Sequence, residues 1–159
     1  MFEIEVQIST QRFLVYQNKQ LIRDHLVSTA KNGAGEEYGS QKTPRGKHII
    51  RAKIGHNCPV NTVFIGRRPT GEIYTPEMKK LYPGRDWILT RILWLSGLEL
   101  GKNRLGQVDT MRRYIYIHGT GDDVQLGSPG SRGCIRMRNE HLIELFDLIP
   151  IGTPLTITE

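Results

Sequence analysis

The most constraining feature of this sequence is the contrast between many short strand-like segments and one helical repeat close to the C-terminus. Five apolar residues there follow the i, i+3, i+4, i+7 spacing of a helix with one buried face: Leu142, Ile143, Leu145, Phe146 and Ile149. Asn139 has the side chain of an N-cap, and Pro150 and Gly152 stop the helical pattern. These signals predict one main helix in an otherwise β-rich chain.

Strand signals occupy most of the remaining sequence. Residues Phe2 to Ile8 alternate apolar and polar side chains, which predicts a strand with one apolar face. Segments 12–16 and 20–30 flank turn residues at 17–19 and predict a hairpin. Further strands are predicted at 48–55, 62–66, 114–118 and 154–158. Turns are predicted at 67–72 and 82–86, and a short helix at 77–82.

The intervening segments fit a single domain. Residues 31–46 are rich in glycine and polar residues and predict a loop, whereas 87–97 are apolar enough to lie in the core. Residues 98–113 are polar and contain glycine, which predicts an exposed loop. The chain has 159 residues and no repeat, low-complexity tract or linker, so we expect one domain over residues 1–159 with a proper core.

Charge and hydropathy limit the partners. The net charge of +6 and the pI near 9.5 indicate an anionic partner without identifying it. Lys42, Arg45 and Lys47 form a basic cluster, but no aromatic residues or binding motif accompany it, so we expect no nucleic acid. The longest apolar run, "WILTRILWL", is interrupted by Arg91 and is too short to cross a bilayer, so we expect no membrane insertion.

The N-terminus and the cysteines bear on the compartment. The first residues lack the basic start and unbroken apolar core of a secretory signal. We therefore expect a cytoplasmic protein if Met1 is the natural start, and a periplasmic or cell-envelope protein if the N-terminus has been trimmed. Cys58 and Cys134 are too few for a disulfide framework.

Residues 114–138 concentrate the side chains that could do chemistry. His118 ends a predicted strand, and a glycine-rich loop leads from it to Cys134. A nucleophilic cysteine needs a base, and a histidine brought close across a loop can serve. The uncrowded backbone at Gly133 could present amide donors to an oxyanion. Residue types alone support a nucleophile and a buried packing residue about equally, because free cysteine is commonly buried.

Three arginines surround this cysteine, namely Arg132, Arg136 and Arg138. Their charge would favour the thiolate and lower the pKa of Cys134. Their planar guanidinium groups also suit bidentate binding of a carboxylate. This stretch therefore predicts an acidic substrate.

The other candidate sites are weaker. His56 and Cys58 could be combined with His118 and Cys134 as zinc ligands, but the separations match no common ligand spacing. We therefore expect no metal and no cofactor. The remaining histidines are expected to be surface or structural residues, and they are His25, His48 and His141.

The motifs "IHGT" and "SRGCIRM", with the glycine-rich spacer between them, resemble the catalytic domain of the L,D-transpeptidase family. The segments "KTPRGKHII" and "DLIPIGTPLTI" are similar to further parts of that domain, so the resemblance covers most of the chain. It implies a mostly β fold, a sandwich or barrel with one main helix near the C-terminus. It also implies a cysteine acyl-enzyme mechanism and peptidoglycan stem peptides or muropeptides as substrates.

Carried over by position, the resemblance implies that Cys134 is the nucleophile, His118 the general base and the Gly119 carbonyl the group that orients the imidazole. Ser131 and Gly133 would shape the loop. The amides of Gly133 and Cys134 would hold the oxyanion.

The resemblance also suggests how substrate is held. Arg136 would bind a substrate carboxylate, and Arg132 and Tyr116 would contact substrate as well. Many family members carry a second histidine where this chain has Arg132, so the resemblance assigns no catalytic role to that position.

What attacks the thioester decides the activity. Without an export signal, the sequence favours a monomeric L,D-carboxypeptidase that removes the terminal D-Ala from tetrapeptide stems in cytoplasmic muropeptide recycling. The alternative is an L,D-transpeptidase that forms cross-links or exchanges D-amino acids in the cell envelope. A non-enzymatic alternative is a catalytically weak module that binds stem peptides.

Overall fold

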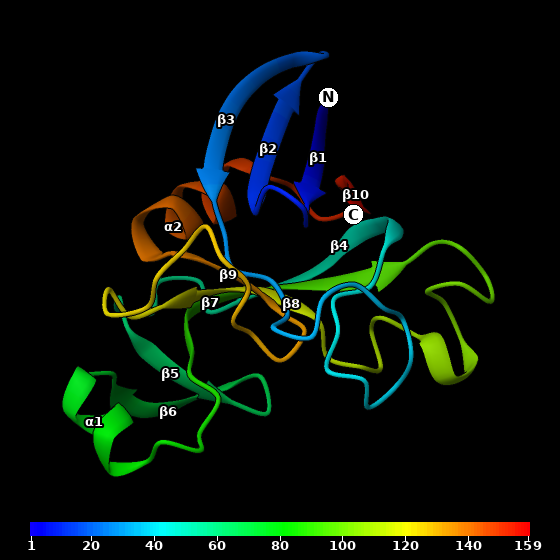
Figure 1. The fold of residues 1–159 in the computed structure, drawn as a ribbon. Helices are drawn as coiled ribbons and strands as arrows, with labels where there is room; N and C mark the ends of the chain where they lie inside the picture. Colours follow the sequence, from blue (N-terminus) through cyan, green and yellow to red (C-terminus); the bar gives the residue numbers. More distant parts are fainter.

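The computed structural model describes residues 1–159 and contains ten strands, two α-helices and a short 3-10 helix (Figure 1). The strands are β1 Phe2–Gln7, β2 Arg12–Gln17, β3 Gln20–Leu26, β4 Gly46–Ile54, β5 Thr62–Ile65, β6 Arg68–Ile73, β7 Ile88–Gly97, β8 Tyr116–Thr120, β9 Ile135–Arg138 and β10 Pro154–Thr158. The helices are α1 Pro76–Leu81, α2 Asn139–Leu148 and η1 Gly106–Val108.

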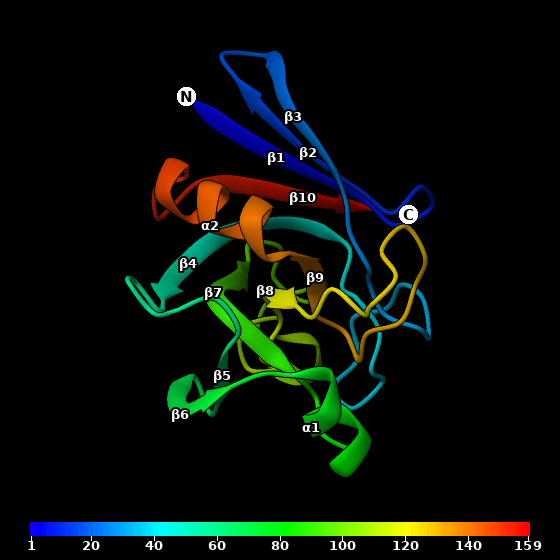
Figure 2. The ribbon, with the colours of Figure 1, turned by 90° about the vertical axis from the view of Figure 1, so that its left-hand side faces the viewer.

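All ten strands belong to one curled mixed sheet (Figures 1 and 2). Its main path runs β3-β2-β1-β10-β4-β7-β5-β6, and β8 and β9 branch from β7. The pairs β1–β10 and β8–β9 are parallel, and the other pairs are antiparallel. Helix α2 packs against β7, β8 and β9 within the curl. The branch β8–β9 is therefore held between β7 and the helix.

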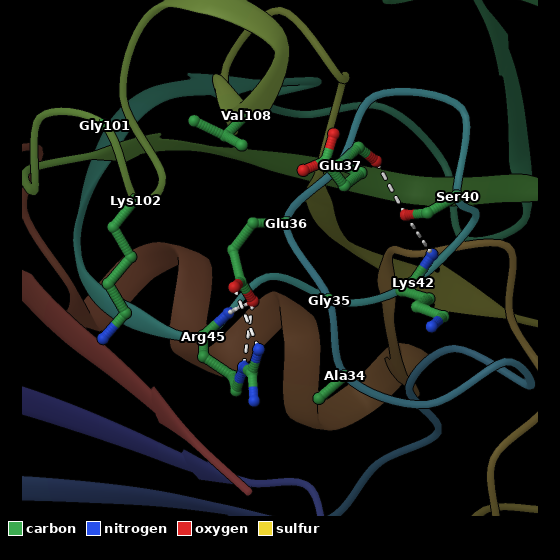
Figure 3. Close-up of a pocket in the computed structure, with 10 residues that line it drawn as sticks. All are labelled: Ala34, Gly35, Glu36, Glu37, Ser40, Lys42, Arg45, Gly101, Lys102 and Val108. Atoms are coloured by element: carbon green, nitrogen blue, oxygen red, sulfur yellow. Dashed lines mark hydrogen bonds and ion pairs between the residues drawn. The ribbon is translucent and has the colours of Figure 1, made fainter.

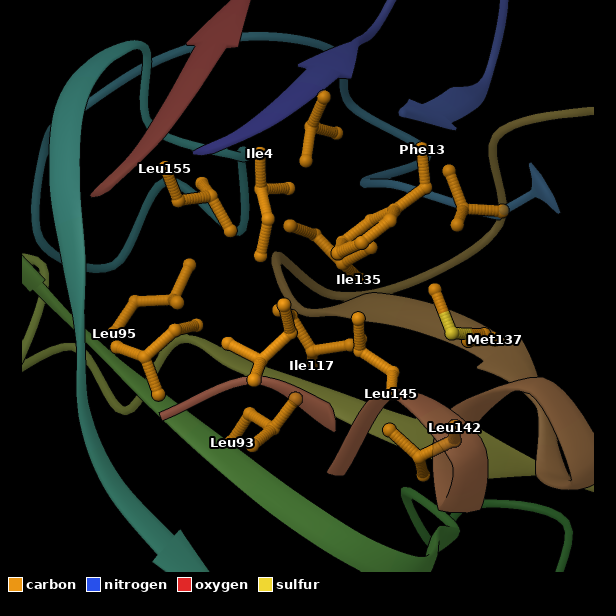
Figure 4. Packing of buried hydrophobic residues seen from close by; sticks show 14 of the residues in the cluster. Ile4, Phe13, Leu93, Leu95, Ile117, Ile135, Met137, Leu142, Leu145 and Leu155 are labelled. Atoms are coloured by element: carbon orange, nitrogen blue, oxygen red, sulfur yellow. The ribbon is translucent and has the colours of Figure 1, made fainter. Parts of the chain in front are cut away.

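The main core lies inside the curl. Figure 4 shows Ile4, Phe13 and Leu155 from one side of the curl facing Ile117 and Ile135 from β8 and β9. Each of these five side chains is at most 3% exposed. Removing such a side chain from water contributes about 1.5–3 kcal/mol. The burial of Ile117 and Ile135 therefore fixes which way β8 and β9 face.

The predicted mainly β fold with one main helix near the C-terminus is confirmed. The N-terminal strand, the hairpin and the C-terminal strand form where they are predicted, except that the second hairpin strand ends at Leu26 and not at Ala30. In β1, Ile4 and Val6 are buried while Glu3 and Glu5 are not, as the alternation requires. Neither α-helix is long and apolar enough to cross a membrane.

The turn predicted at 67–72 is wrong, because most of this segment forms β6. The reversal is tighter and lies at Gly66 and Arg67, which both have positive φ values, 56° and 64°. Strand β6 pairs only with β5, so it is an edge strand, where Pro69 need not donate a ladder hydrogen bond.

The predicted strand 114–118 is shifted by two residues. Tyr114 has a φ of 56° and lies outside the sheet, and the strand instead runs to Thr120. Asn139 is not the N-cap but the first residue of α2. Its amide oxygen accepts a hydrogen bond from Thr90 Oγ1 at 2.7 Å, and its amide nitrogen donates to Asn61 Oδ1 at 2.8 Å. The side chain of Asn139, which could have capped the helix, is thus part of a long-range hydrogen-bond network instead.

The loop 98–113 is less exposed than predicted. Asn103 and Thr110 are fully buried. The Asn103 amide donates to the carbonyl oxygens of Arg45 and Lys47, and its oxygen accepts from Glu99 N–H. The loop is polar because its side chains satisfy neighbouring backbone groups, so polarity here does not indicate exposure.

Candidate active site

The parallel pair β8–β9 sorts the candidate residues by face. Its register pairs Ile117 with Ile135 and His118 with Arg136. Because side chains alternate along a strand, paired residues share a face, and the isoleucines face the main core. His118 and Arg136 therefore share the opposite face. Cys134, one residue before β9, lies on that same face.

The turn before Cys134 is held by hydroxyl groups. Ser131 Oγ donates to the Cys134 carbonyl at 2.5 Å, and Gly133 N–H donates to Ser131 Oγ at 3.1 Å. Thr43 Oγ1 donates to the Gly133 carbonyl at 2.8 Å. Gly133 has a φ of 132°, and a Cβ there would lie 3.3 Å from the Lys42 carbonyl oxygen, so glycine suits this position.

These contacts change the predicted oxyanion site. The Gly133 amide, expected to bind the oxyanion, already donates to Ser131 Oγ and is not free. The Cys134 amide makes no hydrogen bond within the protein. Of the two predicted donors, only Cys134 N–H lacks a hydrogen-bond partner within the protein.

Cys134 as a residue is only 9% exposed, and its thiol engages two backbone groups. Its Sγ accepts from Tyr116 N–H at 3.3 Å and donates to the Tyr114 carbonyl at 3.4 Å. Burial, followed by the negative charge of Asp86, raises the pKa of Cys134 to about 12. The cysteine is therefore a thiol at neutral pH, contrary to the lowered pKa predicted from the flanking arginines.

The three arginines expected around Cys134 each bind different groups. Arg136 lies 3.7 Å from Asp86 and donates to the Gly130 carbonyl, and it lowers the pKa of Cys134 less than burial raises it. Arg132 donates to the Gly84 carbonyl. Arg138 donates to the carbonyls of Gly121 and Val124 and does not contribute to the pKa of Cys134.

The imidazole of His118 is completely buried. Its Nδ1 lies 2.7 Å from the Gly119 carbonyl oxygen. Because a carbonyl can only accept, Nδ1 carries the proton and Nε2 carries a lone pair. Nε2 has no hydrogen-bond partner. Burial lowers the pKa of His118, opposed by the charge of Asp86, so the ring is neutral at pH 7.

Two adjoining hollows reach this face, one at Cys134 and one at Arg136, and His118 lines neither of them. The first has a volume of about 380 Å³ and is lined by Cys134 together with Phe64, Arg67, Asp86, Arg113, Tyr116 and Arg132. The second, of about 270 Å³, contains Arg136 and Thr120 and shares Asp86 and Arg132 with the first. Asp86 and Arg132 thus stand where the two hollows meet.

Sequence reasoning missed three charged residues of this site, namely Arg67, Asp86 and Arg113. Asp86 acts on the pKa values of both His118 and Cys134, and Arg113 lowers the pKa of Cys134. Asp86 lies in a predicted turn and Arg113 at the end of a predicted loop. Neither position carries a spacing signal, because the contact with β8 and β9 arises only on folding.

A larger hollow, which neither Cys134 nor His118 lines, is drawn in Figure 3. It has a volume of about 460 Å³ and lies between the 34–45 loop and residues 101–108. Glu36 accepts two hydrogen bonds from the Arg45 guanidinium, so this basic residue already has a counter-charge. The hollow is lined by neither cysteine nor histidine.

Comparison with known proteins gives consistent matches. Residues 2–157 match the family pattern of the L,D-transpeptidase catalytic domain (YkuD). A putative L,D-transpeptidase of Bacillus subtilis is 37% identical over 94 residues, which are 59% of this chain and 47% of that protein. Its Bacillus licheniformis counterpart is 26% identical over 157 residues, which are 99% of this chain and 66% of that protein. The chain thus spans about half to two thirds of these relatives.

A solved structure agrees with the fold. The complex of the L,D-transpeptidase LdtMt1 with imipenem superimposes with a TM-score of 0.62 at 18% identity, over 99% of this chain and 58% of that one. At this identity the match concerns the fold alone.

Proposed function

This chain belongs to the L,D-transpeptidase catalytic domain family, and from that premise we propose that it transfers acyl groups of peptidoglycan stem peptides through a thioester on Cys134. One observation carries the assignment of the reacting pair. His118 presents an unprotonated, unpartnered Nε2 on the strand face that also carries Cys134. A buried acceptor without a partner is costly, which is expected where the partner is a reacting proton.

We infer the acylation step from the strand face that His118 and Cys134 share. His118 Nε2 accepts the proton of Cys134 Sγ while the sulfur attacks the carbonyl of the residue that precedes the terminal D-Ala. Tyr116 N–H, already directed at Sγ, stabilises the developing thiolate. Cys134 N–H is the available donor to the oxyanion. The C–N bond then breaks, and D-Ala leaves with the proton from His118.

The raised pKa of Cys134 makes this proton transfer part of the reaction. A free thiolate is scarce at pH 7, so attack requires simultaneous transfer to His118. This protects the cysteine from nonspecific alkylation.

Transfer to an amine is our preferred second step. An acceptor amine loses its proton to His118, forms the new C–N bond and releases Cys134 as the thiol. The two hollows that meet at Asp86 and Arg132 leave room for a second peptide. The matched Bacillus relatives are also named as L,D-transpeptidases. Hydrolysis, which the sequence favoured, stays a prediction for the same thioester.

Product analysis decides between these outcomes. Purified protein is incubated with disaccharide tetrapeptide, with and without a D-amino acid acceptor, and the products are identified by mass spectrometry. A dimer or an exchanged terminal residue supports transpeptidation, whereas tripeptide alone supports carboxypeptidase activity. Turnover by the Cys134→Ala variant at the wild-type rate would rule out the thioester. The Cys58→Ala variant is the matched control and should retain activity.

Imipenem provides a second probe of the nucleophile. A relative is solved in complex with it, and we expect the β-lactam to acylate Cys134 of this chain as well. Peptide mapping should find the added mass on Cys134 and not on Cys58. Modification of Cys58 alone would contradict the assignment.

A further inference from the structure

The tip of the β5–β6 hairpin brings an arginine into the hollow above Cys134. Arg67 lines this hollow together with Tyr116. Its guanidinium carbon lies 5.1 Å from the centre of the Trp94 ring and 4.7 Å from that of Tyr114. One of its N–H groups donates to the Tyr116 hydroxyl at 3.2 Å. Two aromatic faces and one hydrogen bond thus hold the guanidinium in place.

The backbone at this position does not call for arginine. Gly66 and Arg67 both have positive φ values, as in the two-residue turns that favour glycine and asparagine. A long side chain is unfavourable in this conformation unless it makes contacts elsewhere. Arg67 makes such contacts only inside the hollow and with the aromatic residues beside it.

The other arginines that line this hollow donate hydrogen bonds to backbone carbonyls. Arg113 donates to the carbonyls of Gly35 and Lys42, and Arg132 donates to that of Gly84. Arg67 has no acidic partner and uses one of its five N–H groups. Arg132 also uses one N–H group, but that group is bound to a backbone carbonyl, whereas Arg67 is held by aromatic rings and a hydroxyl.

Arg136, which the resemblance assigned to a substrate carboxylate, already has an acidic neighbour. It faces the carboxylate of Asp86 at 3.7 Å and donates to the Gly130 carbonyl. Arg136 also does not line the hollow that contains Cys134, whereas Arg67 does. The assignment of Arg136 therefore fits the structure less well than an assignment of Arg67.

We propose that Arg67 binds the C-terminal carboxylate of the donor stem, the D-Ala carboxylate next to the scissile bond. Tyr116 connects the two events, because its backbone N–H contacts Cys134 Sγ and its hydroxyl contacts Arg67. Arg67 and Cys134 line the same hollow, so a carboxylate on Arg67 would share that space with the attacked carbonyl. This inference rests on the proposed function and adds to it the recognition of the free C-terminus of the donor stem peptide.

The test compares two stems on matched variants. One stem is disaccharide tetrapeptide with its free D-Ala carboxylate, and the other carries a C-terminal carboxamide. The Arg67→Asn variant retains a residue that tolerates positive φ, so the hairpin should fold. The Arg68→Asn variant removes an equal charge from the same hairpin at an exposed site that does not line the hollow.

We expect wild type and Arg68→Asn to prefer the free acid in kcat/KM by at least about tenfold, as for loss of a charge-assisted hydrogen bond. Arg67→Asn should lose this preference, with a much larger fall in kcat/KM for the free acid than for the carboxamide. Arg67→Lys, which retains the charge but not the planar fork, should recover only part of it. An undiminished preference in Arg67→Asn, or no preference in wild type, overturns the proposal.

Binding without chemistry separates this proposal from the proposed function. In the Cys134→Ala background, calorimetric titration should show tighter binding of the free acid, and the added Arg67→Asn substitution should abolish the difference. If this result is obtained while wild type turns over neither stem, the carboxylate site stands and the acyl-transfer function fails. If turnover occurs but neither binding nor kcat/KM depends on Arg67, the acyl-transfer function stands and the carboxylate site at Arg67 fails.

Discussion

Two buried histidines of this protein are alike in burial but differ in one hydrogen bond. His48 in β4 and His118 in β8 are both fully buried, and in each the Nδ1 donates to a nearby carbonyl, that of Gly46 or Gly119. Nε2 of His48 accepts from Thr110 Oγ1 at 2.9 Å, whereas Nε2 of His118 has no partner. The two histidines thus carry the same tautomer, but Nε2 has a hydrogen-bond partner in His48 and none in His118.

The difference separates a structural histidine from a reactive one. The hydroxyl of Thr110 satisfies His48, so its burial ties β4 to the 98–113 loop. The open Nε2 of His118 lies on the face that carries Cys134, where a substrate and a transferable proton can satisfy it. Burial or pKa alone could not make this distinction, because burial lowers the pKa of both histidines.

The largest effect is expected from exchanging the reactive histidine. His118→Gln should reduce kcat/KM by about 10²–10⁴-fold, the usual contribution of a general base. His48→Gln is the matched control and should retain the activity of each folded molecule while losing stability. Steady-state kinetics and denaturant titration of both variants measure the two effects. Equal loss of activity per folded molecule in the two variants would remove the distinction.

Acid should destabilise the fold through the structural histidine. Burial lowers the pKa of His48 from 6.5 to about 4, so between these values the unfolded chain binds a proton that the folded chain does not. The stability contributed by neutral His48 is present above pH 6.5 and is lost as pH falls toward 4, by about 3 kcal/mol. Urea titrations should show this loss in wild type and a smaller one in His48→Gln. Parallel losses in the two proteins would exclude His48 as the cause.

These two histidines also show how far the sequence could predict the site. The motif pair around His118 and Cys134 could be recognised because its residues are close along the chain. The alternation in β1 and the helical period in α2 placed the main elements, because burial of one face is a local pattern. The partner of His48 lies 62 residues away, so its role was not visible.

The charged surroundings of Cys134 were harder to predict for the same reason. Arg132 and Arg138 are near in sequence, yet their guanidinium groups bind backbone carbonyls of other loops. Asp86 and Arg67 come from turns that only the sheet topology brings to β8. The sign of the Cys134 pKa shift depends on burial in the folded state, which the flanking residues cannot reveal.

A smaller change should make His48 resemble His118. Thr110→Val removes the hydroxyl and leaves Nε2 of His48 buried without a partner, which should cost about 1–3 kcal/mol of stability. No second nucleophile lies at this site, so the catalytic rate per folded molecule should not change. Thermal unfolding and the rate of D-Ala release report the two quantities. An unaltered stability would mean that water or a neighbouring group satisfies His48 without Thr110.

The smallest predicted effect concerns the negative charge of Asp86, which acts on the pKa values of both His118 and Cys134. Asp86 raises the pKa of both residues, so Asp86→Asn should lower both and increase the thiolate fraction at a given pH. Iodoacetamide should then alkylate Cys134 about two- to tenfold faster at pH 9, since Asp86 is partly exposed and solvent screens its charge. Asp24→Asn, an exposed residue paired with Arg12, is the control for net charge. Slower alkylation of the Asp86 variant would show that its carboxylate acts mainly by holding Arg136 beside Cys134, because loss of that cation would raise the pKa of the thiol instead.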